Sequence, residues 1–413
     1  MMTALLMGLV LLPGVSVSPM AAPQAVVQED KPVFDRLAAV ERGVAALIEM
    51  QESLAGAEQL NEWPYEGVYR VRGDKGRGRI IPLGYRVGGT AISAWALCAA
   101  PGWKRDKPRR VAVERALDFI LEQLDEPGLA ADFVGAYDVR GWGQTYALSF
   151  LCQLKARDLV PRKQRRAVDK AISSLVETLQ QTEITESGGW NYSRPGRGKG
   201  PSDASTFMTA SVLQALFSAA ELGETLQPKV IARALATLRA ARLSSGAFQY
   251  GSDPDNATGR GFEAVPGAIG RMPICEVTLL LAGEGDQKHL TLAVDAFLDE
   301  WQALEDRRAQ DGTHEPPYMV APYYFCYAHL YAAQAIEGLP KELREQYRER
   351  FRARLFSVMD TDGTWNDRVF ERSANFGTAT AILALLQPDL SYPAAWEAPA
   401  PPRKRTTSGG DGR

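Results

Sequence analysis

The chain has 413 residues, enough for two or three domains of average size or for one large repeat fold. Hydrophobic residues make up 45% and charged residues 23% of the composition, which excludes a disordered or fibrous protein. The 47 Lys and Arg residues are balanced by 50 Asp and Glu residues, and the resulting net charge of −3 gives no drive toward nucleic acid. Three His and four Cys residues leave little material for a metal cluster or a disulfide scaffold, and we expect no cofactor.

The two ends of the chain differ from its middle. Residues 1–25 have the order of a secretory signal peptide, because the apolar run Ala4–Val17 is followed by small residues up to Ala25 before the first charge at Glu29. The run is shorter than the ~20 residues of a membrane helix. No Lys or Arg precedes it, so an uncleaved anchor or a wrongly assigned start is the alternative. We expect export to the periplasm or the medium, no membrane span after signal removal, and a disordered basic tail over residues 396–413.

Between these ends, over residues 30–395, two kinds of helical segment alternate. The first kind is amphipathic. Around Val33–Gln51, charged residues interrupt apolar residues that recur at intervals of three and four, namely Phe34, Leu37, Val40, Val44 and Leu47. Similar helices are expected near Arg109–Leu124, Lys163–Gln181, Pro228–Arg242, Lys288–Glu305 and Lys341–Val358.

The second kind of segment is apolar or small on every side. Its copies are Thr90–Ala100, Thr145–Leu154, Thr206–Ala220, Ile274–Ala282, Tyr323–Ile336 and Phe376–Leu386. Across them Glu276 is the only formally charged side chain. A helix without a polar face must be surrounded by protein, and an amphipathic neighbour with one apolar stripe is suited to cover it.

The order of these segments predicts the architecture. A Gly- and aromatic-rich loop precedes each apolar segment, and the apolar segments recur about every 57 residues. A unit of this kind cannot bury its apolar face alone, so the units must stack. We therefore predict an all-α (α/α)6 toroid, with six apolar helices in an inner ring and six amphipathic helices in an outer ring. An open solenoid is the alternative, but wholly apolar inner helices favour closure.

The loops repeat two motifs, GGWxY and DGxW, and each motif leads into a helix that begins with Ser or Thr. The clearest copies are Gly188–Tyr192 and Asp362–Trp365, and weaker copies lie at 246–250 and 311–313. In these motifs the chain resembles the squalene–hopene cyclase and protein prenyltransferase α/α toroid superfamily, and in particular its secreted bacterial relatives that lack the known catalytic motifs. The resemblance implies the toroid fold over nearly the whole mature chain. It does not assign an activity, because this fold hosts unrelated functions.

The resemblance suggests where catalytic acids should lie. Proton-initiated cyclases use an Asp-x-Asp-Asp-Thr motif, and the nearest stretch here, Ser202–Thr206, retains only Asp203, out of register. A buried acid needs neighbours that tune its pKa. We therefore expect Asp203 to accept backbone N–H bonds at a helix start, with acid catalysis as the alternative. Glu276 is the second weak candidate, although the dipole of a helix that starts near Pro273 explains it. The chain contains no Asp-Asp pair to hold magnesium diphosphate.

The resemblance to prenyltransferases also raises the possibility of zinc. Cys275 opens one apolar segment, and Cys326 and His329 share a face of the next, so three soft ligands could meet at the ring centre. Pro273 stands where the Asp ligand of that motif belongs. Because free Cys and a lone helical His are usually core residues, we expect no metal and free, buried thiols.

Aromatic residues near the loops are the main candidates for ligand binding. The candidate set is Trp142, Trp190, Tyr192, Tyr250, Arg271, Tyr323, Tyr324 and Trp365. Such residues can line an apolar cup or stack on sugar rings. For Trp190, Tyr250 and Trp365 we favour the alternative that they fill gaps between repeats, and for Arg271 that it forms a loop pairing. The basic loops 66–86 and 193–199 are interpreted as solvated, with an anionic ligand as the alternative.

Two functional hypotheses follow. The leading one is an exported binding module without assignable catalysis, which takes an apolar small molecule, a peptide or a glycan in its central cup. The rival is an enzyme on the same scaffold, either a degenerate terpene cyclase or a polysaccharide lyase or glycosidase. A cyclase would have a closed apolar cavity of some hundreds of Å3 with one buried acid. A glycan enzyme would place two carboxylates, or an Arg or Tyr base, around the cup.

Overall fold

The computed structural model describes residues 35–54, 56, 59–72, 79–133, 139–192, 203–251, 259–310 and 312–398. The unit that begins at Asp35 consists mainly of helices. The outer helices are α1 (Arg36–Glu49), α3 (Lys107–Gln123), α5 (Arg165–Gln181), α7 (Pro228–Ala241), α10 (Gln287–Asp299) and α13 (Lys341–Ser357). The inner helices are α2 (Leu83–Ala99), α4 (Arg140–Ala156), α6 (Thr206–Glu221), α9 (Met272–Leu281), α12 (Tyr324–Gly338) and α14 (Ser373–Leu386). Short elements in the loops include α8 (Val265–Ala268), α11 (Gln302–Glu305) and the antiparallel hairpin of β1 (Val71–Arg72) and β2 (Arg79–Ile80).

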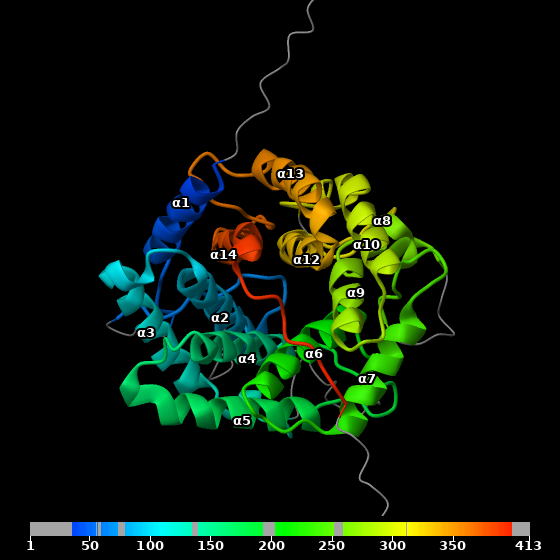
Figure 1. The fold of residues 1–413 in the computed structure, drawn as a ribbon. Helices are drawn as coiled ribbons and strands as arrows, with labels where there is room; N and C mark the ends of the chain where they lie inside the picture. The colour runs from blue at the N-terminus through cyan, green and yellow to red at the C-terminus, as the bar shows by residue number, and fades with distance from the viewer. Residues whose placement is uncertain are drawn as a thin grey trace, which may run out of the picture. The chain divides into compact units, whose positions relative to one another are not determined.

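The inner helices close into a ring. Each packs against the next in the order α2, α4, α6, α9, α12 and α14, and α14 packs back against α2 (Figure 1). Outer helices cover this ring from α1, which contacts α14 and α2, to α13, which contacts α12. The closure confirms the predicted all-α toroid. Among the described residues, no helix combines the length and the apolar character that crossing a membrane requires.

The burial of the two rings follows their sequences. The inner helix α6 is buried from Thr206 to Phe217, since helices surround it on every side. The outer helix α5 buries one stripe only, which includes Ile172, Leu175 and Leu179. Each fully buried Leu or Ile contributes about 1.5–3 kcal/mol to the stability of the fold. The stripe of each outer helix therefore holds it on the inner ring.

Two inner helices begin earlier than expected. Helices α2 and α4 start at Leu83 and Arg140, in stretches that the Gly-rich composition assigned to loops. The glycines are needed because these two helices pack very closely. A Cβ atom on Gly88 would lie 2.3 Å from Cζ3 of Trp142, so no larger residue fits there. The glycines here allow close helix packing and do not break the helix.

Three loops are held by the same tryptophan arrangement, formed by Trp63, Trp190 and Trp365. Each indole Nε1 donates a hydrogen bond of 2.6, 2.6 or 2.9 Å to a carbonyl of the preceding outer helix, on Leu47, Leu179 and Leu355 respectively. Each backbone N–H donates to a threonine Oγ1 in the following inner helix, at 2.9, 3.0 and 3.1 Å, on Thr90, Thr209 and Thr378. Each tryptophan thus joins an outer helix, a loop and an inner helix.

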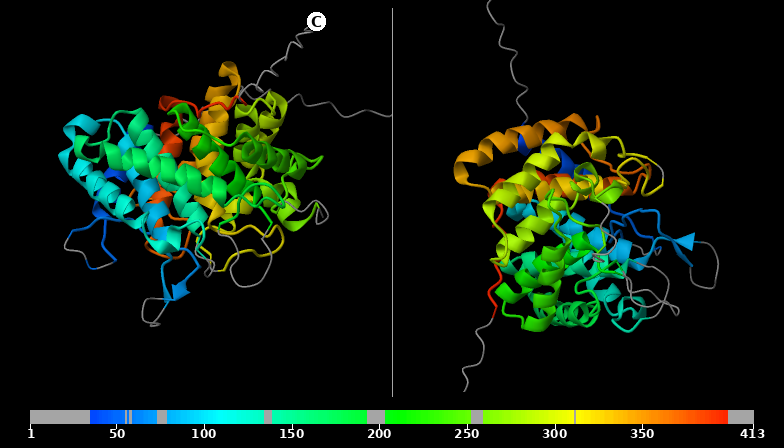
Figure 2. Two further views of the ribbon diagram at one scale, coloured as in Figure 1. Left: turned by 90° about the horizontal axis from the view of Figure 1, so that it is seen from below. Right: turned by 90° about the vertical axis from the view of Figure 1, so that its right-hand side faces the viewer.

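The tryptophans also place the residue two positions later. That residue is Tyr65, Tyr192 or Asp367, and its side chain is 3%, 6% or 0% exposed. The long loops gather at one end of the ring, which we call the loop end (Figure 2). At the opposite end the segment after α14 crosses the ring toward α6 (Figure 1), where Trp396 stacks on Phe217 with ring centroids 5.7 Å apart. The loop end is therefore where the repeated motifs converge.

Candidate functional site

A pocket lined by aromatic side chains lies at the loop end, and we call it the aromatic pocket. Five of its residues belong to the first turns of inner helices, namely Tyr85, Trp142, Phe207, Tyr327 and Phe376. Four come from the loops, namely Tyr65, Tyr69, Tyr192 and Tyr323. Every described residue that lines the pocket is aromatic.

The rings of the aromatic pocket pack mostly edge to face. Trp142 lies near the middle, with its ring centroid 5.6 Å from that of Tyr85 at 90° and 5.9 Å from that of Phe376. Such pairs contribute about 0.5–1.5 kcal/mol each beyond the area that they bury. The free space among the rings is about 20 Å3, room for about one water molecule. Tyr69 and Tyr323 are half-buried and form the mouth, whereas the other seven residues are buried.

Behind Tyr65 lies a buried acid, Asp367. The Tyr65 hydroxyl donates to Oδ2 of Asp367 at 3.4 Å, and Oδ1 has no hydrogen-bond partner in the described part of the chain. Burial raises the pKa of Asp367 to about 7, although the charge of Arg368 opposes the rise. The carboxyl group is therefore close to half-protonated at neutral pH. It can pass a proton into the pocket through the Tyr65 hydroxyl.

The next residue, Arg368, is also buried, with 2% of its side chain exposed. Its Nη2 donates to the Gly312 carbonyl at 3.3 Å. The positive charge of Arg368 lowers the pKa of the hydroxyls of Tyr65, Tyr69 and Tyr85, although burial, which acts more strongly, raises all three. These three hydroxyls with Asp367 and Arg368 form what we call the polar corner of the aromatic pocket.

A histidine lies behind the other side of the mouth. Nδ1 of His314 is 2.7 Å from the Met319 carbonyl, and Nε2 is 3.0 Å from the Tyr323 hydroxyl. A carbonyl only accepts, so Nδ1 carries the proton and Nε2 accepts from Tyr323. Burial lowers the pKa of His314, which keeps the ring neutral. The dyad can therefore take up a proton from the mouth of the pocket through Tyr323.

The structure separates the aromatic candidates into three groups. Trp142, Tyr192 and Tyr323 line the aromatic pocket. Trp190 and Trp365 serve as loop anchors and fill gaps between repeats. Tyr250 and Tyr324 pack behind the lining. The ring centroid of Tyr250 lies 4.9 Å from that of Phe262, and the centroid of Tyr324 lies 5.3 Å from that of Phe207.

Arg271 has a structural role, because its side chain holds loops together. It is 1% exposed, and its guanidinium donates to the backbone carbonyls of Phe248, Gln249, Gly267 and Phe262. A guanidinium that is surrounded by carbonyls of its own loops holds those loops together. The polar corner contains a different arginine, Arg368.

The two acids chosen from the sequence lie elsewhere. Asp203 is exposed, and the expected capping role is wrong because α6 is preceded by Ser205 with no side-chain capping bond. Glu276 is 2% exposed and receives two hydrogen bonds from Arg242, at 2.7 and 2.5 Å. This ion pair joins α9 to the end of α7, so the helix dipole alone does not explain Glu276.

The suggested zinc ligands do not meet. Nε2 of His329 accepts from Trp301 Nε1 at 2.9 Å, and Nδ1 is 2.7 Å from the Phe325 carbonyl, so both ring nitrogens are engaged within the protein. Burial raises the pKa of the Cys275 and Cys326 thiols, which disfavours the thiolate form that binds metal. Among the described residues no three His, Cys, Asp or Glu side chains gather as metal ligands. All four cysteines are buried and free.

The candidate set from the sequence contains three of the nine described lining residues, and it also lacks His314, Asp367 and Arg368. The sequence contained one signal for Asp367. It lies two positions after the anchor tryptophan, where other repeats carry Tyr65 and Tyr192. An acid at a position that otherwise carries buried tyrosine departs from the repeat and points to a special role. No such signal marks His314 or Arg368, which reach the site through loop geometry.

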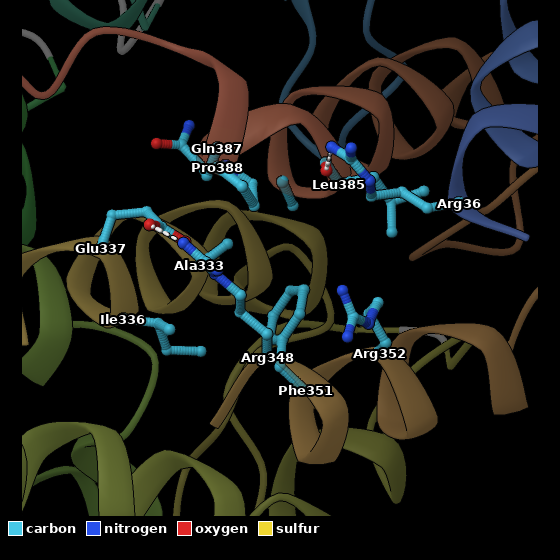
Figure 3. Close-up of a pocket in the computed structure, with 11 residues that line it drawn as sticks. Arg36, Ala333, Ile336, Glu337, Arg348, Phe351, Arg352, Leu385, Gln387 and Pro388 are labelled. Atoms are coloured by element: carbon cyan, nitrogen blue, oxygen red, sulfur yellow. Dashed lines mark hydrogen bonds and ion pairs between the residues drawn. The ribbon is translucent and has the colours of Figure 1, made fainter. Parts of the chain in front are cut away.

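Two other cavities are lined by ion pairs and hydrogen bonds within the protein. One, of about 20 Å3, lies between α12, α13 and α14, where Arg348 bonds Glu337 and Arg36 donates to the Leu385 carbonyl (Figure 3). The other is an open cleft of about 270 Å3 at the seam between the first and last repeats, where Glu52 and Glu66 both pair with Arg372. Arginine-paired carboxylates of this kind stabilise the junction of helices and loops.

Comparisons with known proteins support the fold. No protein-family model matches the chain, and no curated protein matches it. Among solved structures, a type II terpene cyclase from Scytonema in complex with geranylgeranyl dihydroxybenzoate has a TM-score of 0.51 at 13% identity, over 87% of this chain and 100% of that one. An α-1,6-mannanase of Salegentibacter in complex with α-1,6-mannotriose has a TM-score of 0.52 at 10% identity, over 86% and 100%. A cellobiose 2-epimerase from Bacillus thermoamylovorans has a TM-score of 0.51 at 12% identity, over 86% and 99%.

At these identities the likeness is one of fold. The chain has the α/α toroid fold that type II terpene cyclases share with glycan-active enzymes, as the loop motifs implied. The neighbours include proteins with apolar and with carbohydrate ligands. The choice between these classes for this chain depends on its own site.

Proposed function

We propose that this protein binds a small apolar ligand in the aromatic pocket. The observation that carries the proposal is the lining, in which all nine side chains are aromatic and converge from five inner helices and the loops between them. A surface of this kind offers apolar area and ring faces, and its polar groups are the tyrosine hydroxyls and the indole N–H of Trp142. The half-buried Tyr69 and Tyr323 would move aside as the ligand enters, because the free space is about 20 Å3.

The burial of the lining favours a small molecule over a glycan or a peptide. Sugar rings stack on aromatic faces that are open to solvent, whereas seven of the nine lining residues are buried. A peptide would need an open groove with exposed hydrogen-bonding groups. The terpene cyclase among the structural neighbours holds an isoprenoid-substituted benzoate, and a ligand of related apolar character suits this lining.

Trp142 provides a direct test, since it is the one tryptophan that lines the aromatic pocket. We expect geraniol, a ten-carbon isoprenoid alcohol, to bind with measurable heat and to change the tryptophan fluorescence. In Trp142→Phe the aromatic lining is kept, so the heat of binding should persist while the fluorescence change is lost. Isothermal titration calorimetry and fluorescence titration of both proteins measure this.

Trp103→Phe is the matched control, because Trp103 lies in a short helix at Trp103–Arg105, outside the lining of the pocket. This variant should keep both the heat and the fluorescence change. Mannotriose serves as the glycan probe and should give neither. The proposal would be overturned if geraniol produced no heat, or if mannotriose bound and geraniol did not.

A second candidate function, acid–base catalysis on the bound ligand, is favoured by Asp367 and the His314–Tyr323 dyad on two sides of the pocket. Tyr65 would give its proton to the ligand and be reprotonated by Asp367, while Tyr323 would accept a proton from the ligand and pass its own to His314. The formula of the ligand is unchanged, so the reaction class is isomerisation. A cyclisation would need a cavity of some hundreds of Å3, whereas the free space here is about 20 Å3. Products with the same mass as geraniol should form with the wild type but not with Asp367→Asn. If both proteins bound geraniol without converting it, the catalytic proposal would be overturned and the binding function would stand.

We also propose that the protein acts outside the cytoplasm. The proposal rests on residues 1–25, where an apolar run is followed by small residues, as in a secretory signal peptide. The intact mass of the protein recovered from the periplasm or medium of a bacterial host should correspond to a chain that lacks about the first 25 residues. A full-length mass in the cytoplasmic fraction would contradict export.

A further inference from the structure

One charged group of the site, Arg368, has no ion-pair partner among the described residues, and its guanidinium lies over the Phe370 ring, 5.5 Å from the centroid. Within the described part of the chain, Nε and Nη1 of Arg368 have no hydrogen-bond partner, although the side chain is only 2% exposed. A guanidinium keeps its charge in proteins, and burying it unpaired costs several kcal/mol on general grounds. Its neighbour Asp367 offers little compensation, because Asp367 has a pKa of about 7 and its Oδ1 is equally unpartnered. Arg368 is therefore held in place with unused donors.

Arg368 adjoins the aromatic pocket without lining it, because it follows Asp367, whose Oδ2 accepts a hydrogen bond from the lining residue Tyr65. The charge of Arg368 acts on the hydroxyls of Tyr65, Tyr69 and Tyr85, and all three residues line the pocket. Tyr69 is half-buried at the mouth. A ligand that fills the pocket thus has one polar corner beside it, with an arginine and three hydroxyls, and aromatic rings on its other sides.

The helices add to the positive potential. Each inner helix that lines the pocket begins at the loop end, because it follows one of the long loops. Tyr85, Trp142, Phe207, Tyr327 and Phe376 all lie in the first turns of these helices, so five positive dipole ends surround the aromatic pocket. The aromatic faces alone would favour a cation, but Arg368 and the helix ends oppose one.

We propose that the ligand of the aromatic pocket carries a carboxylate, which Arg368 binds. This inference rests on the proposed binding function and narrows it to apolar monocarboxylic acids. One carboxylate supplies one negative charge and oxygen acceptors for Nε, Nη1 and the tyrosine hydroxyls, which pairs the single buried guanidinium. A diphosphate would bring two or three charges to a corner with one arginine, so it suits this corner less well than a carboxylate.

Three probes with one carbon skeleton test the head group: geranate, geraniol and geranylamine. We expect geranate to bind the wild-type protein at least about tenfold more tightly than geraniol, and geranylamine to bind most weakly. In Arg368→Met the advantage of geranate over geraniol should fall below about twofold, with the affinity for geraniol little changed. Arg368→Lys keeps the charge but loses the planar fork, so it should retain part of the preference.

The salt dependence of geranate binding distinguishes a buried guanidinium from exposed charges, and the relative affinities of the three probes test the carboxylate proposal separately from the proposed function. Because the guanidinium is buried, the affinity for geranate should change less than about twofold between about 0.05 and 0.5 M NaCl, whereas attraction by solvent-exposed charges would be screened. Equal binding of all three probes, or tightest binding of geranylamine, would overturn the proposal and leave the apolar pocket intact. Failure of every probe to bind would instead overturn the proposed function. The three-probe comparison on the wild type decides the matter even if Arg368→Met does not fold.

Discussion

Trp365→Ala is expected to lower the free energy of unfolding by about 3–5 kcal/mol, the range for removing a large buried aromatic side chain. Trp365 is 1% exposed, and its indole N–H and backbone N–H donate to Leu355 in α13 and to Thr378 in α14. The substitution leaves a cavity between the two helix layers and an unpaired carbonyl at the end of α13. It also loosens the loop that carries Asp367 and Arg368, so binding in the aromatic pocket should weaken as well.

Urea unfolding followed by circular dichroism measures this effect. Trp365→Phe keeps a ring in the cavity and loses the indole N–H, so it should cost about 1–3 kcal/mol. Trp103→Ala is the matched control, because Trp103 is only half-buried and stacks on the Arg109 guanidinium with 5.6 Å between the charge and the ring centroid. If Trp365→Ala destabilised the protein no more than Trp103→Ala, the tryptophan anchor would not hold the layers together.

Asp367→Asn is expected to stabilise the protein at about pH 8, by up to about 4 kcal/mol, and to leave its stability near pH 4 almost unchanged. Burial raises the pKa of Asp367 from 3.8 to about 7, so between these values the folded protein binds more protons than the unfolded chain. The stability that comes from the neutral carboxyl is complete below pH 3.8 and is lost as the pH rises through about 7. Asparagine stays neutral at all pH values and avoids the loss.

Thermal unfolding of both proteins between about pH 4 and pH 8 tests this linkage. Asp132→Asn is the control, since Asp132 is exposed and its substitution should leave the pH dependence unchanged. Parallel stability curves for wild type and Asp367→Asn over this pH range would show that folding does not raise the pKa of the carboxyl. An acid that is kept at such a cost in stability is consistent with a role in the site, because proteins give up stability at functional positions.

The pattern of apolar residues determined the ring. A stretch such as Thr206–Ala220 has no polar face, so it can exist only inside a shell of other helices, and six copies with amphipathic partners close into a toroid. The anchor role of Trp190 and Trp365 could also be predicted, because the same loop motif recurs and a recurring residue fills a recurring gap. These are local or periodic properties, which a sequence displays directly.

The tertiary structure alone decided which polar groups meet. Glu276 and Arg242 are 34 positions apart, and nothing in either segment indicates that the chain brings them within hydrogen-bonding distance. Tyr65 and Asp367 come from the first and last repeats, 302 positions apart, and they meet only because the ring closes. Burial beside Tyr65 raises the pKa of Asp367, and the lack of partners makes Arg368 a candidate for ligand binding. Desolvation and pairing depend on every neighbour in space, so the sequence determined the scaffold while the closure of the ring determined the chemistry of its site.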